Sequence, residues 1–530
     1  MSLCLLNFRT SRNASGGMGF SFSKIEKIER GYCANVEKNI LFGLQSVEKN
    51  ILFFVWSVEI IIFFDKMNKK KYYHQNINRW KVKMMFKRKV YEELLAWKKE
   101  WDGKYACLLE GARRVGKTTI AEEFARNEYD SYILIDFSNT SKEMMDIFDD
   151  ISKLDRFFLR LQMEAGVELY ERKSVIIFDE IQLFPKARQA IKHLVKDGRY
   201  DYIETGSLIS IKKNVKNILI PSEEHKIHVY PMDYEEFLWA TGGNPNVLDM
   251  AYKSDMELGN AANRNAMRDF RIYMAVGGMP QAVECYISTN SFESVDKVKR
   301  EILELYYDDL KKIDASGRIT DMYKSVPCQL AAKKKHYAIT TATGKQKTRK
   351  DEERLFELIE SGLVLPCYNV LNPSVSLAQT KDMNCFKLYL SDIGLFTTML
   401  FNDAQNGIED IYKKLLSDTL TADLGYLYEN VVAQAIKASG RDLYYHTWKK
   451  EGSTHSFEID FLITSKNKVV PIEVKSAAIN NHKSIDNFEI KYSKQVGERF
   501  LLSQKDVGKI GTLKLKPIYM ILFLLKDLRK

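Results

Sequence analysis

Apolar and polar positions alternate along residues 85–245 in a way that predicts buried strands separated by helices. Tyr105–Leu109, the segment SYILIDF and Ser174–Phe178 are short, apolar and rich in β-branched residues. Runs of this kind are typical of strands that are buried on both faces of a parallel sheet. The intervening stretches repeat apolar side chains at the helical period. The pattern therefore predicts an α/β domain.

The first part of the chain has a different pattern. Amphipathic patterning begins abruptly at Met85 with FKRKVYEELLAWKKEW, and the heptapeptide VEKNILF occurs twice between residues 36 and 53. The apolar run Ile51–Phe64 is fourteen residues long and contains an acid, whereas a membrane span needs about 20 apolar residues. We expect residues 1–84 to be an extension outside the folded body without a stable membrane span. A role at a membrane surface is the alternative.

GARRVGKT at residues 111–118 matches the pattern GxxxxGK[ST] between a predicted strand and a predicted helix. The glycines let backbone N–H groups curl around phosphates, and the helix presents its positive end to the same anion. Lys117 would reach the β- and γ-phosphates, and the Thr118 hydroxyl would ligate Mg²⁺. We therefore predict ATP as the ligand and Mg²⁺ as the cofactor. The expected nucleotide-contacting residues are Gly111, Ala112, Arg113, Arg114, Val115, Gly116, Lys117, Thr118, Thr119 and Ser207.

An acid pair follows the third apolar strand. SVIIFDE ends in Asp179 and Glu180, at the strand edge where ligands of parallel sheets bind. We expect Asp179 to hold Mg²⁺ and Glu180 to orient the attacking water. SYILIDF separates this strand from the P-loop strand, which indicates the additional-strand class of P-loop proteins. In that class a polar residue on an inserted strand senses the γ-phosphate, and the predicted sensor is Ser207, with Thr205 as second choice.

The negative charge that develops on the γ-phosphate during hydrolysis is usually stabilised by an arginine. No Arg occurs from Ser207 to Thr241, the stretch after the sensor strand. A finger supplied by a second subunit is equally compatible with the sequence, which would make hydrolysis depend on a homo-oligomer. The candidates within the chain are Arg113, Arg114, Arg188, Arg264, Arg268 and Arg271.

Six motifs occur in a recognisable order: GARRVGKT, IIFDEIQ, YIETGSLIS, YPMDYEEFLWA, GGMP and LYLSDIGLF. From Met85 onward the sequence thereby resembles the prokaryotic AAA+-like ATPases that carry a C-terminal domain of unknown function. The resemblance implies ATP binding, ATP hydrolysis and a link to nucleic acid. It also implies the order of parts that follow the extension (1–84): a P-loop ATPase domain (85–245), a helical lid and winged-helix region (246–400) and a PD-(D/E)XK nuclease-like α/β domain (401–530).

A basic segment lies in the middle region. Lys333–Lys350 carries seven Lys or Arg and no acid. A predicted helix at Asp351–Ser361 and the strand-like runs LVLPCYNV and CFKLYLS follow, as in a helix-turn-helix with a wing. Contact with the phosphate backbone of DNA and a solvated loop are equally compatible with this segment.

The last region places acids on successive predicted elements. Glu429 lies in a helix, Glu458 and Asp460 alternate along one strand, and Glu473 and Lys475 alternate along the next. Residues two apart on a strand share a face. Asp460 and Glu473 on paired strands are therefore predicted metal ligands, and Lys475 would position a water or stabilise charge. The pattern is similar to the PD-(D/E)XK nuclease core, with an inactive binding module as the alternative.

Composition adds little to this picture. The net charge of +10 over 530 residues permits a nucleic-acid partner without requiring one. Seven scattered cysteines without metal-ligand spacing predict a reducing, cytoplasmic compartment. We expect an ATP-dependent switch that acts on DNA. The alternative is a regulatory ATPase that acts on a protein partner and uses a non-catalytic nuclease-like scaffold.

Overall fold

The computed structural model describes residues 85–207, 221–344, 346–401, 408–417, 425–453, 455–476 and 482–529, together with four short strand segments near the N-terminus. Met1–Lys81 and Val82–Lys530 form two compact units. In the first unit β1 (Thr10–Arg12) pairs antiparallel with β2 (Met18–Phe20), and β3 (Ser46–Val47) pairs with β4 (Asn50–Ile51). The rest of the extension expected over residues 1–84 lies outside the described residues.

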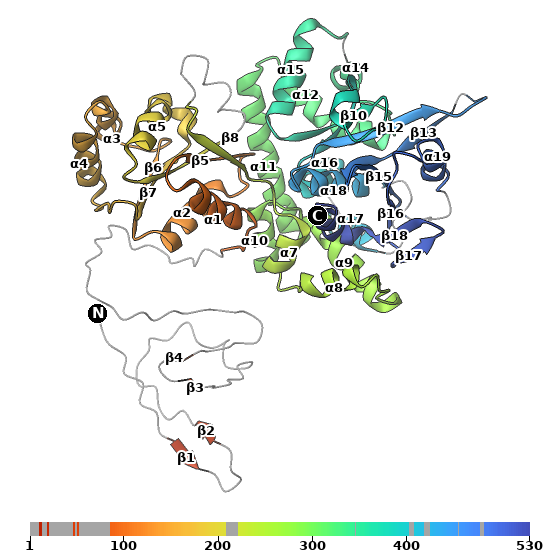
Figure 1. Cartoon of the computed structure of the whole chain (residues 1–530), viewed down its shortest axis with the longest axis horizontal. Helices are drawn as coiled ribbons and strands as arrows, with labels where there is room; N and C mark the ends of the chain where they lie inside the picture. Colours follow the sequence, from red (N-terminus) through yellow and green to blue (C-terminus); the bar gives the residue numbers. More distant parts are fainter. Residues whose placement is uncertain are drawn as a thin grey trace. The chain divides into compact units, whose positions relative to one another are not determined.

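The ATPase domain contains a five-stranded sheet in the order β6-β7-β8-β5-β9 (Figure 1). All its strand pairs are parallel. One strand does lie between the P-loop strand β5 and the acidic strand β7, but it is β8, which carries the predicted sensors, whereas SYILIDF forms β6 at the edge of the sheet. The strands are β5 (Ala106–Gly111), β6 (Ser131–Asp136), β7 (Ser174–Asp179), β8 (Asp201–Ser207) and β9 (Glu224–His228).

Alternate side chains of the sheet belong to two different cores. Cys107 and Leu109 pack with α1 (Val90–Trp101) and α2 (Lys117–Glu128), whereas Leu108 packs on the opposite face. The second face is covered by α4 (Leu154–Ala165) and α5 (Pro185–Asp197). Strands sandwiched in this way must be apolar on both sides, which explains their continuous apolar runs.

The middle region is helical and contains a hairpin, which α16 (Ile393–Leu400) follows. The strands β10 (Val364–Val370) and β11 (Lys381–Leu390) pair antiparallel, as the two strand-like runs predict. β10 also pairs parallel with β12 (Leu443–Lys449), so one sheet crosses the predicted boundary between residues 400 and 401. The helices are α9 (Asn260–Val276), α10 (Pro280–Thr289), α11 (Phe292–Ile313), α12 (Arg318–Lys324), α13 (Val326–Ala331), α14 (Ile339–Thr343) and α15 (Arg349–Glu360).

In the C-terminal region the predicted strand SFEIDFLI is broken at Asp460. Its first half, β13 (Ser456–Ile459), pairs with β12. Its second half, β14 (Phe461–Ser465), joins a separate sheet in the order β14-β15-β16-β18-β17. Alternation along one strand therefore does not describe Glu458 and Asp460. The other elements are α18 (Gly425–Ala438), β15 (Lys468–Val474), α19 (Lys483–Lys491), β16 (Arg499–Ser503), β17 (Gly508–Ile510) and β18 (Leu513–Pro517).

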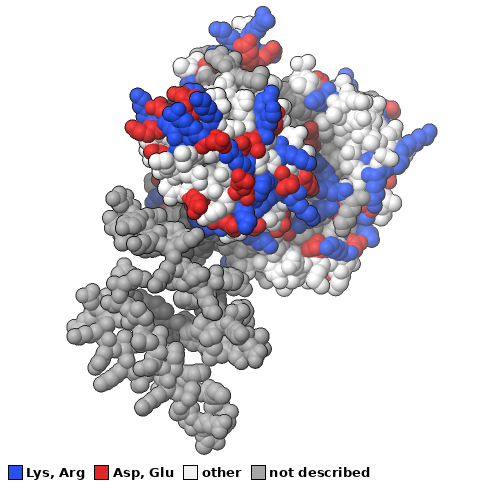
Figure 2. All heavy atoms as spheres, turned by 60° about the vertical axis from the view of Figure 1, so that its left-hand side comes forward, with Lys and Arg blue, Asp and Glu red and all other residues white. Residues whose placement is uncertain are grey.

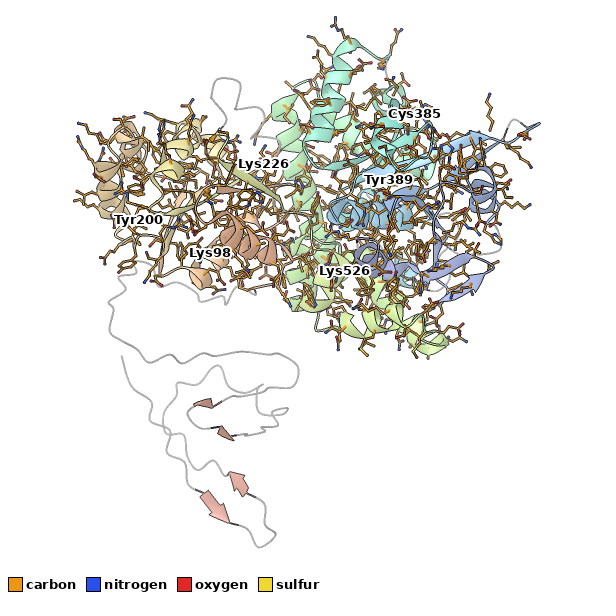
Figure 3. The ribbon with its side chains drawn as sticks, viewed as in Figure 1. Lys98, Tyr200, Lys226, Cys385, Tyr389 and Lys526 are labelled. Atoms are coloured by element: carbon orange, nitrogen blue, oxygen red, sulfur yellow. The ribbon has the colours of Figure 1, made fainter. Side chains whose placement is uncertain are left out.

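The C-terminal helix α20 (Ile521–Asp527) contacts the ATPase domain through Lys526, labelled in Figure 3. Its ammonium lies 2.7 Å from a carboxylate oxygen of Glu235 on α7 (Tyr234–Ala240). No helix among the described residues is long and apolar enough to cross a membrane.

Candidate ATP site and C-terminal carboxylate centre

The P-loop between β5 and α2 depends on backbone shapes that favour glycine. Gly116 has φ 96° at the start of α2, in the left-handed region that other residues rarely adopt. A Cβ added to Gly111 would lie 2.3 Å from the carbonyl oxygen of Val229. Side chains larger than hydrogen are therefore excluded at both ends of the loop, and the backbone can curl around an anion.

Lys117 is buried and folds back onto this loop. Its ammonium donates to the carbonyl oxygens of Ala112 at 2.8 Å and Gly111 at 3.1 Å. Burial lowers the pKa of Lys117 to about 8, although the nearby carboxylates of Glu180 and Asp179 oppose the shift. The side chain therefore places a cation where the loop carbonyls and the acid pair converge.

Asp179 accepts two hydroxyl donors on the same oxygen. Thr118 Oγ1 lies 2.7 Å from Asp179 Oδ1, and Thr205 Oγ1 also donates to that atom. Thr205 is fully buried and accepts the backbone N–H of Glu180 at 3.3 Å. The threonine from β8 thus joins both members of the acid pair.

Glu180 is held in a left-handed conformation with φ 53°. For a residue other than glycine this conformation costs about 1 kcal/mol or more, and such strain clusters at functional sites. Gln182 donates to its carboxylate. Ser207, the first-choice sensor, is buried at the end of β8 and pairs in register with Gly111. Both candidate sensors therefore lie near the P-loop, but it is Thr205 that contacts the acids.

A cavity of about 540 Å³ opens beside the P-loop, and its lining includes Lys117, Thr118 and Glu180. Two segments that sequence reasoning did not assign to the site also line it. Phe86 and Arg88 precede α1, and the second segment is Pro280, Gln281 and Glu284 of the GGMP helix α10. The motif GGMP was visible in the sequence, but nothing local indicated that it meets the P-loop.

Arg88 is the clearest functional residue that the sequence did not predict. Its guanidinium donates to the carbonyl oxygens of Val115 at 2.9 Å and Tyr230 at 2.7 Å. It also lies 3.2 Å from Glu236 Oε1. Arg88 thereby ties the P-loop to the segment that precedes α7.

The candidate arginine fingers occupy three different settings. Arg113 and Arg114 line the ATP cavity, and Arg113 pairs with Asp309 at 3.1 Å. Arg188 is buried in a bidentate pair with Glu224 at 2.7 and 2.8 Å. The remaining candidates line a separate cavity on α9: they are Arg264, Arg268 and Arg271.

The predicted C-terminal site residues come together with lysines between them. Asp460 Oδ2 accepts the backbone N–H of Val474 at 2.8 Å. Lys475 lies 2.6 Å from Glu473 Oε1, while Glu473 Oε2 is buried without a hydrogen-bond partner among the described residues. Lys387 of β11 lies 2.6 Å from Glu458 Oε1. Sequence reasoning missed Lys387, which comes from the hairpin of the preceding region.

Burial dominates the electrostatics of this carboxylate centre, defined as Glu429, Glu458, Asp460 and Glu473. Burial raises the pKa of Glu473 to about 7, with Lys475 opposing the shift and Asp460 reinforcing it. Burial likewise raises the pKa of Glu429 to about 7. Tyr389, labelled in Figure 3, donates to Glu429 at 3.1 Å.

Burial alone would lower the pKa of Lys387, but neighbouring carboxylates, foremost Glu458, hold it above its ordinary value. No group of three or more acid, His or Cys side chains among the described residues is arranged to hold a metal ion.

The basic segment Lys333–Lys350 is largely exposed, and α14 forms within it. Lys347 pairs with Glu352 at 2.8 Å. The other described Lys and Arg side chains of this segment form no ion pair with a described residue. Elsewhere, on the face shown in Figure 2, basic and acidic side chains intermix rather than forming one continuous basic surface.

Three family models match separate parts of the chain. The model described as AAA domain matches residues 103–238. Two domains of unknown function follow, DUF8612 over residues 267–406 and DUF4143 over residues 424–514. The uncharacterized protein MJ1637 of Methanocaldococcus jannaschii is 25% identical over 230 residues, which are 40% of this chain. The match spans 45% of that relative's length.

Similar solved structures include the Walker-type ATPase PABY2304 of Pyrococcus abyssi, at 15% identity and a TM-score of 0.37, with 59% of this chain and 96% of that chain covered. The RuvB Holliday junction branch migration motor of Thermotoga maritima is 13% identical, with a TM-score of 0.24, 53% of this chain and 89% of that chain covered. At TM-scores below 0.5 we draw no functional conclusion from these likenesses. The family match and the parallel sheet agree, so residues 103–238 form an AAA-type ATPase domain with a P-loop NTPase fold.

Proposed function

We propose that the chain binds ATP with Mg²⁺, hydrolyses it, and acts as a nucleotide-dependent switch on DNA. The observation that carries the ATPase part is the junction at Asp179, where hydroxyls from the P-loop helix and from β8 meet on one carboxylate oxygen. This junction lies next to the buried ammonium of Lys117. Hydroxyl and carboxylate oxygens are donors that suit Mg²⁺.

The proposed roles follow from these positions. Thr118 and Asp179 would hold Mg²⁺, which neutralises phosphate charge when it is bound. Lys117 would exchange its carbonyl partners for phosphate oxygens. Glu180 would orient water and accept its proton, while Thr205 keeps the acid pair in register. Ser207 would supply a second polar group beside Gly111, the first glycine of the P-loop.

Contacts of the P-loop with α11 offer a route from the nucleotide to the rest of the chain. Tyr306 donates to the carbonyl oxygen of Arg113 at 2.8 Å, and Arg113 pairs with Asp309 one turn of helix later. The GGMP segment is also anchored, because Gly278 N–H donates to the buried carboxylate of Asp392 at 2.7 Å. A change at the P-loop would thus reach the middle region directly.

DNA is the proposed partner because the basic segment Lys333–Lys350 is exposed and only Lys347 of its described side chains is neutralised by a described residue. The second candidate function is a regulatory ATPase that acts on a protein partner. The ion pairs of Lys387 and Lys475 within the carboxylate centre favour it, because a carboxylate neutralised by lysine is a poor metal ligand.

The test measures ATP turnover by the purified chain with and without duplex DNA, and separately measures ATP affinity. Lys117→Ala should abolish detectable ATP binding because it removes the phosphate-neutralising ammonium. DNA should stimulate turnover by the unaltered chain. If turnover does not respond to DNA, the second candidate function, a regulatory ATPase, is supported instead. Full ATP affinity in Lys117→Ala would overturn the assignment of the ATP site.

A further inference from the structure

A second cavity, of about 390 Å³, is lined mainly by one arginine-bearing face of α9. Arg264, Arg268 and Arg271 follow one another at spacings of four and three residues, which places them on the same side of a helix. The end of α17 (Ile408–Leu416) forms the opposite side. Among the described residues, the lining contains no Asp or Glu. We call this cavity the arginine pocket.

Two of these arginines are exposed and form no ion pair with a described residue, although Arg268 interacts electrostatically with the neighbouring Asp269. Arg264 donates to the carbonyl oxygen of Asn260 on its own helix at 3.2 Å. Arg268 forms no ion pair with a described residue. By contrast, Arg113 and Arg188 each pair with an acid. Two exposed guanidinium groups that are not tied up in ion pairs beside a cavity are suited to bind an anion.

The floor of the arginine pocket is linked by hydrogen bonds toward the end of β15, the strand that carries Glu473. Arg271 is buried and donates to the carbonyl oxygen of Leu416 at 3.3 Å and to the side-chain oxygen of Gln504. The amide nitrogen of Gln504 in turn donates to the carbonyl oxygen of Ser476, the residue after Lys475. Figure 1 shows α9 next to α17. Arg271, Gln504 and the backbone of Ser476 thus form a chain of hydrogen bonds from the pocket to the residue that follows Lys475.

We propose that the arginine pocket binds the phosphate backbone of a nucleic-acid strand and leads it toward the carboxylate centre. The proposal rests on the action on DNA proposed above, and it adds a contact surface distinct from Lys333–Lys350. A nucleic-acid strand carries one negative charge per nucleotide. Successive phosphates can therefore pair with successive arginines along α9. A polyanion is repelled by buried carboxylates, and the arginines offset that repulsion at the entrance.

The test uses a fluorescein-labelled oligodeoxythymidylate and the full chain, with affinity measured by anisotropy between about 50 and 200 mM salt. Arg264→Ala/Arg268→Ala should bind about tenfold more weakly at 0.1 M salt, and its plot of log affinity against log salt should be shallower by about 1.4, for two lost phosphate contacts. The matched control is Lys192→Ala/Lys196→Ala. These exposed lysines lie four residues apart on α5, so the control variant loses the same charge as the test variant. It should leave both the affinity and its salt dependence unchanged.

Three outcomes would overturn the inference. If Arg264→Ala/Arg268→Ala binds like the unaltered chain while Lys333→Ala/Lys335→Ala loses affinity, the pocket is not a DNA surface and the proposed action on DNA stands. If the unaltered chain hydrolyses ATP but binds no oligonucleotide at the lowest salt, the inference falls together with the DNA part of the proposed function. Tighter binding of polyglutamate than of the oligonucleotide would assign the pocket to an acidic protein.

Discussion

The ATP site and the carboxylate centre both gather acids and a lysine, but they neutralise charge in different ways. At the ATP site Asp179 receives hydroxyl donors, and Lys117 rests on backbone carbonyls. In the carboxylate centre Glu458 and Glu473 each receive a lysine ammonium. Neutral donors leave the charge of an acid available to a metal ion, whereas a lysine cancels it. Matching residue types therefore do not establish matching chemistry.

The difference is already visible in where the partners come from. Thr118 follows Lys117 directly in the sequence, and Thr205 comes from the neighbouring strand of the same sheet. Lys387 instead comes from β11, and its partner Glu458 lies on β13, which β10 and β12 separate from β11 in the sheet order. The ATP site is thus local to one domain, while the state of the carboxylate centre depends on how two regions pack.

The independence of the two sites is tested most directly by changing one acid in each of them and comparing ATP turnover. Glu180→Gln should lower ATP turnover by about 10²- to 10³-fold while ATP remains bound, because the amide cannot take a proton from water. Asp460→Asn is the matched control. It should leave turnover within about twofold of that of the unaltered chain, which is far less than the loss expected when a catalytic base is removed. Steady-state turnover and ATP affinity of both variants decide it. Equal loss of turnover in Asp460→Asn would mean that the two centres do not act independently.

A sharper test concerns which residue of β8 supports the acid pair. Thr205→Val keeps the shape and removes the hydroxyl shared by Asp179 and Glu180, so we expect about a 30-fold fall in turnover, since a buried carboxylate loses a charge-assisted hydrogen bond. Ser207→Ala should cost less than about threefold, because the hydroxyl of Thr205 makes the two hydrogen bonds to the acid pair. Single-turnover hydrolysis of bound ATP measures both. A larger effect from Ser207→Ala would return the sensor role to that residue.

Lysine neutralisation of the carboxylate centre is tested by Lys387→Met. Removal of the ammonium next to Glu458 should raise affinity for Mn²⁺ by about tenfold, since one repelling charge disappears beside the carboxylates. Mn²⁺ titration followed by electron paramagnetic resonance measures this without any activity. Lys483→Met, an exposed lysine on α19, is the control and should leave Mn²⁺ affinity unchanged. Weaker Mn²⁺ binding in Lys387→Met would show that this lysine shapes the centre rather than blocking it.

The smallest expected effect is a loss of folding stability at lower pH that comes from His446 in the C-terminal region. Burial lowers the pKa of His446 to about 4, and its ring contacts the carbonyl oxygen of Val370 and the hydroxyl of Tyr492. The unfolded chain, with a pKa near 6.5, takes up the proton first. Stability is therefore fully present above pH 6.5 and is lost as pH falls toward 4, by about 0.8 kcal/mol at pH 6.

His446→Gln isolates this contribution, because Glu429 and Glu473 titrate in an overlapping range with the opposite sign. Their raised pKa means that the folded state binds protons first, so their contribution grows as pH falls. Denaturant unfolding at pH 7 and pH 6 should show a less favourable change in stability for the unaltered chain than for His446→Gln, by about 0.7 kcal/mol. Equal changes in both chains would show that the imidazole is not responsible.

The sequence alone determined the order of the P-loop, the acid pair and the inserted strand. These features are local: glycine spacing fixes a loop, and continuous apolar runs fix strands that are buried on both faces. The expected helix at Asp351 begins two residues earlier, at Arg349, because Thr348 and Asp351 form a capping box. Such small shifts at helix ends are set by single side chains.

Only the tertiary structure decided which distant side chains meet. Arg88 reaches the P-loop across 27 residues, and Lys387 meets Glu458 across 71. The strand carrying Asp460 is broken because its two halves join different sheets, which no alternation of side chains reveals. Local spacing encodes the backbone path of a motif, but the counter-charge that sets its chemistry arrives through packing of elements far apart in the sequence.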